Sequence, residues 1–104
     1  MYNILIVDDM LVNRKLMKKV LSDTLPDICF LDAEDGFQAL ECLDKQEIDL
    51  VILDLMMPGK DGYEVLADMK KDHRHQDIPV IVNSAVTDME TRIIHEAVNT
   101  VPGM

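Results

Sequence analysis

The sequence is poor in cysteine: only Cys29 and Cys42 are present, and their spacing is not that of a CxxC motif. Both lie in otherwise apolar segments, so we expect two reduced, buried thiols of the kind found in cytoplasmic proteins. Long hydrophobic runs are also absent, and no basic stretch followed by an apolar one opens the chain. We therefore expect a cytoplasmic protein that is neither exported nor embedded in a membrane.

Basic residues are scarce relative to acids, because 10 lysines and arginines stand against 20 aspartates and glutamates, a net charge of -10. A surface of this sign repels nucleic acids and anionic membranes, so we expect neither as a partner. Apolar residues make up 48% of the 104 positions, which is too many for an intrinsically disordered chain. The length suits one compact core, and we expect a single domain over residues 1–104.

Four short apolar runs are the clearest strand signals in the chain. None of them alternates polar with apolar residues, and continuous runs rich in β-branched residues are typical of parallel strands that are covered on both faces. The four runs are Ile4–Val7, Ile28–Leu31, Leu50–Leu53 and Val80–Val82.

Segments with helical periodicity connect these runs. In the first connection Val12, Leu16 and Val20 recur every four residues and predict the buried face of a helix. Pro26 predicts that this helix ends near Leu25. The basic residues expected on its outer face are Arg14, Lys15, Lys18 and Lys19. The later apolar stripes are Phe37, Leu40 and Leu43; then Val65, Leu66 and Met69; and finally Met89, Ile93 and Ala97, preceded by a capping-box pattern at Thr87–Glu90.

Strand and helix thus alternate four times, which predicts right-handed crossovers and an α/β fold with a doubly wound parallel sheet. The last seven residues, 98–104, do not continue this rhythm. Pro102 cannot donate a hydrogen bond to a neighbouring strand, so this tail would make a poor central strand. Asn99 is a candidate left-handed cap that would close the fourth helix.

Acidic residues follow two of the predicted strands at the point where each strand ends. Asp8 and Asp9 come directly after Val7, and Asp54 comes directly after Leu53. Ligands of open α/β sheets bind outside the carboxyl ends of the strands, so these carboxylates share one crevice if the first and third strands are neighbours. Three crowded carboxylates repel one another, and a hard divalent ion with oxygen ligands removes that conflict. The sequence therefore predicts a Mg²⁺ site at Asp8, Asp9 and Asp54.

A single acidic residue after a strand has a simpler alternative role as the N-cap of the next helix. We interpret Asp32 and Asp35 in this way, with Asp35 capping the second helix. The doublet Asp8-Asp9 combined with a third acid after another buried strand is more specific, and it favours the metal site.

The segment after Asp54 predicts a sharp loop, because it contains the turn-forming pairs Pro58-Gly59 and Asp61-Gly62. Such a loop can turn the main-chain carbonyl of Met56 inward as a further metal ligand. Ser84 offers a hydroxyl at the same edge of the sheet; the alternative is a loop serine that satisfies its own backbone. A carboxylate nucleophile, a cation and a hydroxyl are the parts needed to accept a phosphoryl group.

Taken together, these motifs resemble the response-regulator receiver domain, the phosphoacceptor module of two-component signalling. The resemblance extends from about Asn3 to about Ala97, and it implies a flavodoxin-like sheet with the strand order 2-1-3-4. The matching motifs are Ile4–Asp9, Asp35-Gly36, Asp49–Gly62 and Ile78–Val82.

The resemblance implies a role for each candidate site residue. Asp54 would be phosphorylated by a partner histidine kinase or phosphotransfer protein. Asp9 would bind Mg²⁺ directly and Asp8 largely through water, with the Met56 carbonyl completing the protein ligands. Ser84 would be the switch hydroxyl that moves toward the phosphoryl oxygen. The domain would signal by a conformational change and would not be an enzyme acting on a separate substrate.

The chain departs from the family pattern toward its end. Family members continue into a fifth strand, a lysine followed by proline, and a fifth helix, whereas no lysine follows Lys71 here and no aromatic residue follows Tyr63. Lys60 occupies a position that is exposed in the family, so we do not expect it to replace that lysine. One alternative is therefore a non-signalling interaction domain with the receiver fold and an incomplete switch. A hydrolase with an aspartyl nucleophile is disfavoured, because such phosphatases want a second aspartate two residues after the nucleophile, where this chain has Met56.

Without a fifth strand, Val80–Val82 would lie at the edge of the sheet. An apolar edge strand presents unpaired N–H and C=O groups to other chains. We therefore expect self-association, through this edge, by exchange of the fourth helix, or through the uncovered face of the sheet.

The three histidines are interpreted as unremarkable surface residues. His73 and His75 are two positions apart in the polar stretch 71–77, which is typical of a solvated loop and not of metal ligands on a helix. His95 lies among polar neighbours of the fourth helix, and we expect it to be exposed.

Overall fold

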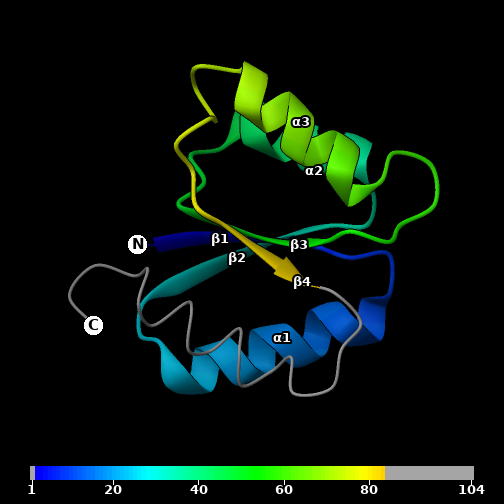
Figure 1. The fold of residues 1–104 in the computed structure, drawn as a ribbon. Coiled ribbons are helices and arrows are strands. Elements are labelled where there is room, and N and C mark those ends of the chain that lie inside the picture. Colours follow the sequence, from blue (N-terminus) through cyan, green and yellow to red (C-terminus); the bar gives the residue numbers. More distant parts are fainter. Residues whose placement is uncertain (1, 84–104) are drawn as a thin grey trace.

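The structure, a computed structural model, describes residues 2–83. In this part of the chain four strands alternate with three helices (Figure 1). The elements are β1 Tyr2–Val7, α1 Leu11–Thr24, β2 Ile28–Ala33, α2 Gly36–Lys45, β3 Leu50–Asp54, α3 Gly62–Lys71 and β4 Val80–Asn83. Each predicted strand is present and is one or two residues longer than the apolar run that indicates it.

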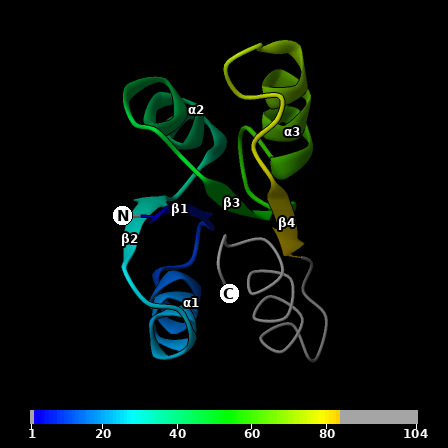
Figure 2. The same ribbon diagram turned by 90° about the vertical axis from the view of Figure 1, so that its left-hand side faces the viewer.

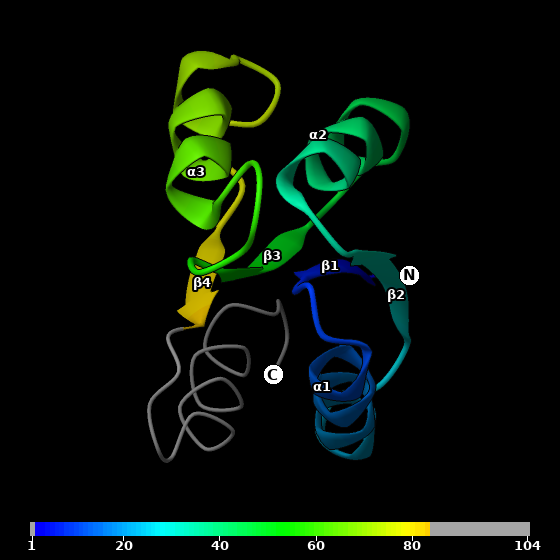
Figure 3. The same ribbon diagram turned by 90° about the vertical axis from the view of Figure 1, so that its right-hand side faces the viewer.

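The four strands are parallel and lie in the order β2-β1-β3-β4. Helix α1 covers one face of the sheet, and α2 and α3 cover the other, as Figure 2 and Figure 3 show. The predicted flavodoxin-like sheet and its strand order are thus confirmed. Strands β1 and β3 are neighbours at the centre, with Val7 opposite Leu53, so their carboxyl ends meet at one edge of the sheet.

Side chains that alternate along a strand divide the core between the two faces of the sheet. From β1, Ile4 and Ile6 pack in one cluster with Leu21 of α1. Leu5 and Val7 belong to a second cluster, which includes buried residues of α2 and α3. The central strands are therefore buried on both faces, and this is why their sequences read as continuous apolar runs.

The predicted buried face of α1 is wrong. Val12 is 71% exposed and Leu16 is 43% exposed. Arg14 and Leu21 are buried instead. The buried face follows a second apolar stripe, Met17, Leu21 and Leu25, and Arg14 lies on the same face because the carboxylate of Asp32 in β2 accepts its guanidinium. A pattern of apolar residues does not indicate a buried cation.

The apolar stripe of α2 is also only partly right. Phe37 is 67% exposed, and the buried residues of this helix are Gly36, Ala39 and Leu43. A Cβ atom added at Gly36 would lie 2.6 Å from the main-chain oxygen of Lys60. The close approach of the loop after β3 explains why a glycine begins α2.

Several predicted features lie outside the described residues: Ser84, the fourth helix with His95, and the tail 98–104. Self-association through the outer edge of β4 accordingly stays a prediction. Cys29 and Cys42 are free thiols, and each is half-buried where the sequence suggested a buried one. Between residues 2 and 83, none of the helices combines the length and the hydrophobicity needed to traverse a bilayer.

Candidate functional site

Three carboxylates meet at the carboxyl ends of β1 and β3. Asp8 and Asp9 follow β1 directly, and Asp54 is the last residue of β3. One carboxylate oxygen from each residue lies within 4.8 Å of the other two. The structure therefore contains the convergence that the positions of these acids after their strands predict.

Asp8 is the most buried of the three, with 1% of its surface exposed. Its Oδ1 accepts a hydrogen bond from the main-chain N–H of Met10 at 2.9 Å, and its Oδ2 accepts one from the Asn13 amide at 3.4 Å. Burial raises the pKa of Asp8, and the charge of neighbouring Asp9 adds to the increase. The two hydrogen bonds lower the pKa of Asp8, but by less than burial and the Asp9 charge raise it.

Asp54 is half-buried and accepts a hydrogen bond at Oδ1 from the main-chain N–H of Met56, 3.0 Å away. Burial raises the pKa of Asp54, and the charges of Asp8 and Asp9 raise it further, against the opposing effect of the Met56 bond. Two of the three carboxylates therefore favour a proton or a cation more strongly than an ordinary surface aspartate does.

The raised pKa of Asp54 predicts that the stability of the metal-free protein depends on pH. A carboxyl group whose pKa is higher in the folded than in the unfolded protein holds more protons when folded. Its stabilising contribution is present at low pH and is lost as the pH rises through the folded pKa. We therefore expect Asp54→Asn to raise the thermal midpoint of the metal-free protein at about pH 7. The difference should shrink near pH 4, about the pKa of an unfolded aspartate.

Calorimetric melts in EDTA at the two pH values measure this effect. Asp35→Asn is the matched control, because Asp35 caps α2 by accepting the N–H of Gln38 at 2.8 Å and asparagine is an equally good cap. The difference in thermal midpoint between Asp35→Asn and the wild type should not change between the two pH values as the difference for Asp54→Asn does. A midpoint of Asp54→Asn at pH 7 no higher than that of the wild type would contradict the predicted repulsion.

The donor atoms at this edge of the sheet are oxygens, the ligands that Mg²⁺ prefers. Asp9 is exposed and Asp54 is half-buried, so an ion can approach both from solvent. Soft transition metals favour sulfur or imidazole, and the three residues offer neither. The site thus fits a hard divalent cation. The role of the Met56 carbonyl as a further ligand stays a prediction, and Ser84 lies outside residues 2–83.

The loop after β3 is held at its far end by the start of α3. Gly62 donates its N–H to the main-chain oxygen of Leu55 at 3.2 Å. Asp61 caps α3 through a capping box with Glu64. Gly59 has a φ of 75°, a left-handed conformation that favours glycine. The turn-forming residues therefore fix the course of the chain immediately after Asp54.

Lys60 was expected to be exposed, but its side chain is only 16% exposed. Its ammonium pairs with Asp68 of α3 at 2.6 Å and lies 5.6 Å from the centroid of the Phe37 ring. The ion pair engages Lys60 with α3.

The two acids interpreted as helix caps differ. Asp35 is the N-cap of α2, as predicted. Asp32 is not a cap: it lies within β2, pairs with Arg14 Nε at 3.0 Å and contacts the ammonium of Lys18. The cap interpretation of Asp32 is wrong because both partners come from the face of α1 that the apolar pattern assigns to solvent.

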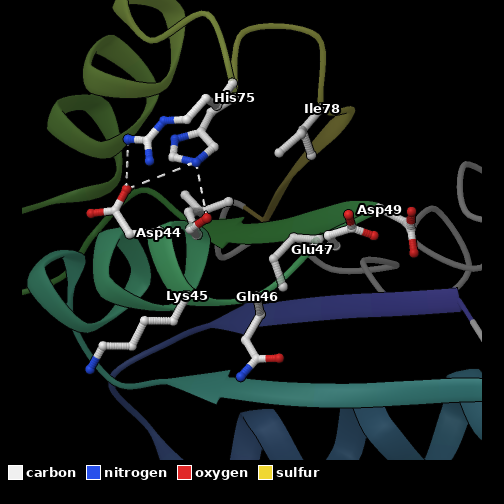
Figure 4. A pocket seen from close by; sticks show the side chains of 10 residues that line it. Asp44, Lys45, Gln46, Glu47, Asp49, His75 and Ile78 are labelled. Carbon is white, nitrogen blue, oxygen red and sulfur yellow. Dashed lines mark hydrogen bonds and ion pairs between the residues drawn. The ribbon is translucent and has the colours of Figure 1, made fainter.

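A polar cluster near the C-terminal end of α2 was missed by the sequence analysis (Figure 4). His75, predicted in a solvated loop, is 5% exposed, and its Nε2 lies 3.0 Å from the main-chain oxygen of Leu43. A hollow of about 480 Å³ adjoins His75 and Leu43. The turn at 73–77 folds back onto α2, and this buries His75 while His73 stays exposed.

The charges of this second cluster compensate one another. Arg74 Nη2 donates to Asp44 at 2.9 Å and to Asp72 at 2.7 Å. The Arg74 guanidinium holds the pKa of Asp72 well below its usual range. Asp44, Asp72 and His75 are close enough to hold a metal ion, but the guanidinium already binds both carboxylates, so we assign no ion to this cluster.

Exposed apolar side chains gather at the edge of the sheet that carries Asp54. Among residues 2–83, six of the seven large exposed apolar side chains follow the carboxyl end of a strand or lie in the first turn of the next helix. This apolar rim consists of Met10, Leu11, Val12, Phe37, Met56 and Tyr63. Apolar groups gathered on a surface are typical of sites that bind another macromolecule.

Comparison of the sequence with known families gives a match over nearly all of its length. The sequence model of the response regulator receiver domain family matches residues 4–100. The cyclic di-GMP phosphodiesterase response regulator RpfG of Xanthomonas campestris pv. campestris is 36% identical over 90 residues, which are 86% of this chain and 24% of that protein. Response regulator RR06 of Streptococcus pneumoniae is 40% identical over 90 residues, 86% of this chain and 39% of that protein. The chain thus spans less than half the length of these relatives.

Solved structures give a similar result. The Mn²⁺-bound form of response regulator Rcp1 has a TM-score of 0.75 and 29% identity, over 96% of this chain and 77% of that chain. The phosphorylated cyanobacterial phytochrome response regulator RcpA has a TM-score of 0.75 and 30% identity, over 97% of this chain and 76% of that chain. One of these similar proteins therefore carries a divalent metal and the other a phosphoryl group.

Proposed function

The chain belongs to the response regulator receiver domain family, and from this premise we propose that it is the phosphoacceptor switch domain of a two-component system. Asp54 receives a phosphoryl group from a histidine kinase or phosphotransfer protein, with Mg²⁺ bound beside it. The domain, residues 1–104, then signals by a change of conformation in the cytoplasm. It is the recipient of the group and not an enzyme with a separate substrate.

The observation that carries this proposal is the approach of the Asp8, Asp9 and Asp54 carboxylates to within 4.8 Å of one another. Such a cluster is electrostatically unfavourable without a cation, and Asp54 is open enough to solvent for a phosphoryl donor to reach it. The Mn²⁺ bound by the similar Rcp1 and the phosphorylation of RcpA support both parts of the proposal.

The proposed reaction moves a phosphoryl group between two side chains. A carboxylate oxygen of Asp54 forms a bond to phosphorus, the P–N bond to the donor histidine breaks, and that nitrogen keeps the electron pair. Bound Mg²⁺ would neutralise charge on the phosphoryl oxygens. Asp9 would hold the ion directly, Asp8 through water, and Met56 through its carbonyl; the Ser84 hydroxyl would then bond to the acylphosphate.

The apolar rim supports a protein as the phosphoryl donor. Its side chains lie on the loops and first helical turns that follow β1, β2 and β3, the same edge that carries Asp54. A small anionic donor needs no apolar contacts, whereas a docking protein buries them.

The alternative is an interaction domain with the receiver fold but no working switch. Incubation with Mg²⁺ and a small acyl phosphate donor, followed by intact mass measurement, separates the two. A gain of one phosphoryl group that disappears when EDTA replaces Mg²⁺ supports the phosphoacceptor. An unchanged mass supports the alternative.

We expect Mg²⁺ to raise the thermal midpoint of the wild type and to have little effect on Asp9→Asn. A ligand that binds only the folded state stabilises it, by about 2.7 kcal/mol at a concentration 100 times Kd. Asp9 is the exposed member of the cluster, so its loss removes the carboxylate most open to the ion. Melts with and without millimolar Mg²⁺ measure the effect.

Asp35→Asn serves as the control here too, because it removes the same charge from a helix cap outside the cluster. This variant should respond to Mg²⁺ as the wild type does. Equal shifts in Asp9→Asn and the wild type would place the ion elsewhere, and no shift in either would remove the metal from the proposal.

A further inference from the structure

Arg14 links the acidic site to the neighbouring strand β2. Its Nη1 donates to the main-chain oxygen of Asp8 at 2.7 Å, and its Nε pairs with the Asp32 carboxylate at 3.0 Å. The side chain is only 9% exposed, although Arg14 lies near the start of α1, where Leu11, Val12 and Lys15 are all exposed. A cation is thus buried directly beneath the carboxylate doublet.

Stability alone is a weak reason for this arrangement. A buried ion pair is often no more stabilising than well-packed apolar residues of similar volume, because both charges lose their hydration. The fork of the guanidinium offers what an apolar side chain cannot, namely two donors in a fixed geometry toward two different acceptors. Its two acceptors here belong to β2 and to the first residue after β1.

The contact to Asp8 determines where Asp9 lies. The carbonyl of Asp8 and the N–H of Asp9 belong to one planar peptide group, so fixing the carbonyl direction also fixes the Cα position of Asp9. The preceding peptide is held as well, because the Asp8 N–H donates to the main-chain oxygen of Ala33 at 3.0 Å. The exposed Asp9 side chain therefore starts from a backbone that is anchored on both sides of Asp8.

We propose that Arg14 is a positioning residue for the cation site, holding the Asp8–Asp9 peptide through the anchor that Asp32 provides. The inference rests on the proposed function, since it assumes a cation between Asp8, Asp9 and Asp54. Arg14 acts through the main chain of Asp8, and Asp32 offsets its charge.

The direction in which Mg²⁺ affinity changes when Arg14 is replaced distinguishes a positioning role from a purely electrostatic one. If Arg14 acted only as a nearby positive charge, Arg14→Met would tighten Mg²⁺ binding, because a repulsive charge is removed. If Arg14 positions the peptide, the same variant binds Mg²⁺ more weakly, by about 10-fold or more, as is typical when support of a metal ligand is lost. Titration calorimetry gives the dissociation constant, and the ¹⁵N–¹H resonance of Asp9 in the metal-free protein reports the peptide itself.

Lys18→Met is the matched control, since Lys18 contacts the other oxygen of Asp32 and lies one turn farther along α1. It removes the same charge from the same carboxylate, and we expect its Mg²⁺ affinity to stay within about 2-fold of the wild type, below the typical cost of losing a ligand's support. Arg14→Lys keeps the charge but not the fork, and weaker binding with a shifted Asp9 resonance is expected there also. If Arg14→Met does not fold, the same measurements on Arg14→Lys test the proposal.

Unchanged or tighter Mg²⁺ binding in Arg14→Met and Arg14→Lys would overturn the positioning role while leaving the proposed function intact. Equal weakening in Lys18→Met would likewise overturn it, because the effect would then follow the charge at Asp32. A wild type that binds no Mg²⁺ by calorimetry would overturn both this inference and the metal site of the proposed function.

Discussion

Replacing Asp54 by asparagine is expected to abolish phosphorylation of the protein by an acyl phosphate or by a kinase. Asparagine has nearly the shape of aspartate and can still accept the Met56 hydrogen bond at Oδ1. Its amide is not a nucleophile, because the negative charge that would attack phosphorus is absent. Intact mass after incubation with donor and Mg²⁺ should show one added phosphoryl group in the wild type and none in Asp54→Asn.

The other acids provide the comparison. Asp35→Asn, which alters a helix cap, should be phosphorylated as the wild type is. Asp9→Asn should be phosphorylated slowly, because it retains the nucleophile and loses a metal ligand. A phosphoryl group that persists in Asp54→Asn would contradict the assignment of the acceptor.

Gly62→Ala is expected to destabilise the fold by about 2–3 kcal/mol, in the upper part of the range of about 1–3 kcal/mol that is typical when extra atoms are forced into a packed site. A Cβ atom added at Gly62 would overlap the main-chain oxygen of Asp54 and would lie 2.6 Å from Leu55 Cα. Both are backbone atoms, so α3 and the end of β3 must separate to make room. Because Asp54 lies at that strand end, the variant should also weaken Mg²⁺ binding.

Gly59→Ala is a control in the same loop with a different cause. Gly59 has a φ of 75°, and an added Cβ there meets no atom within 4 Å. Its cost should be that of a left-handed alanine, about 1 kcal/mol, with Mg²⁺ binding unchanged. Denaturant unfolding of the two variants compares them, and equal losses of stability would show that the packing of Gly62 against β3 is not the cause.

The strands were predictable from a short-range rule, and the acidic site was predictable from the strand ends together with the strand order. Parallel strands that are buried on both faces must be apolar throughout, so Ile4–Val7 and Leu50–Leu53 indicate them without further context. The carboxyl ends of neighbouring parallel strands lie at one edge of the sheet. The positions of Asp8, Asp9 and Asp54 therefore predict the site once the first and third strands are neighbours, an order that the family resemblance implied.

The errors concern polar residues whose partners are distant in the sequence. Arg14 was assigned to solvent because its acceptors, Asp32 and the Asp8 carbonyl, become neighbours only when α1 packs on β1 and β2. His75 was assigned to solvent for the same reason, since its partner is the main-chain oxygen of Leu43. Patterns of apolar residues indicate which face of a helix can be buried at low cost. They do not indicate which charge finds a partner beneath it.

The most direct test of the central claim is to locate the phosphoryl group in the wild-type chain. The protein is incubated with Mg²⁺ and an acyl phosphate donor, the acylphosphate is reduced with borohydride, and the digested peptides are analysed by mass spectrometry. We predict a single reduced residue, Asp54, in the peptide that connects β3 to α3. A reduced residue at Asp8, Asp9 or any other position, or no reduced residue at all, would contradict the account.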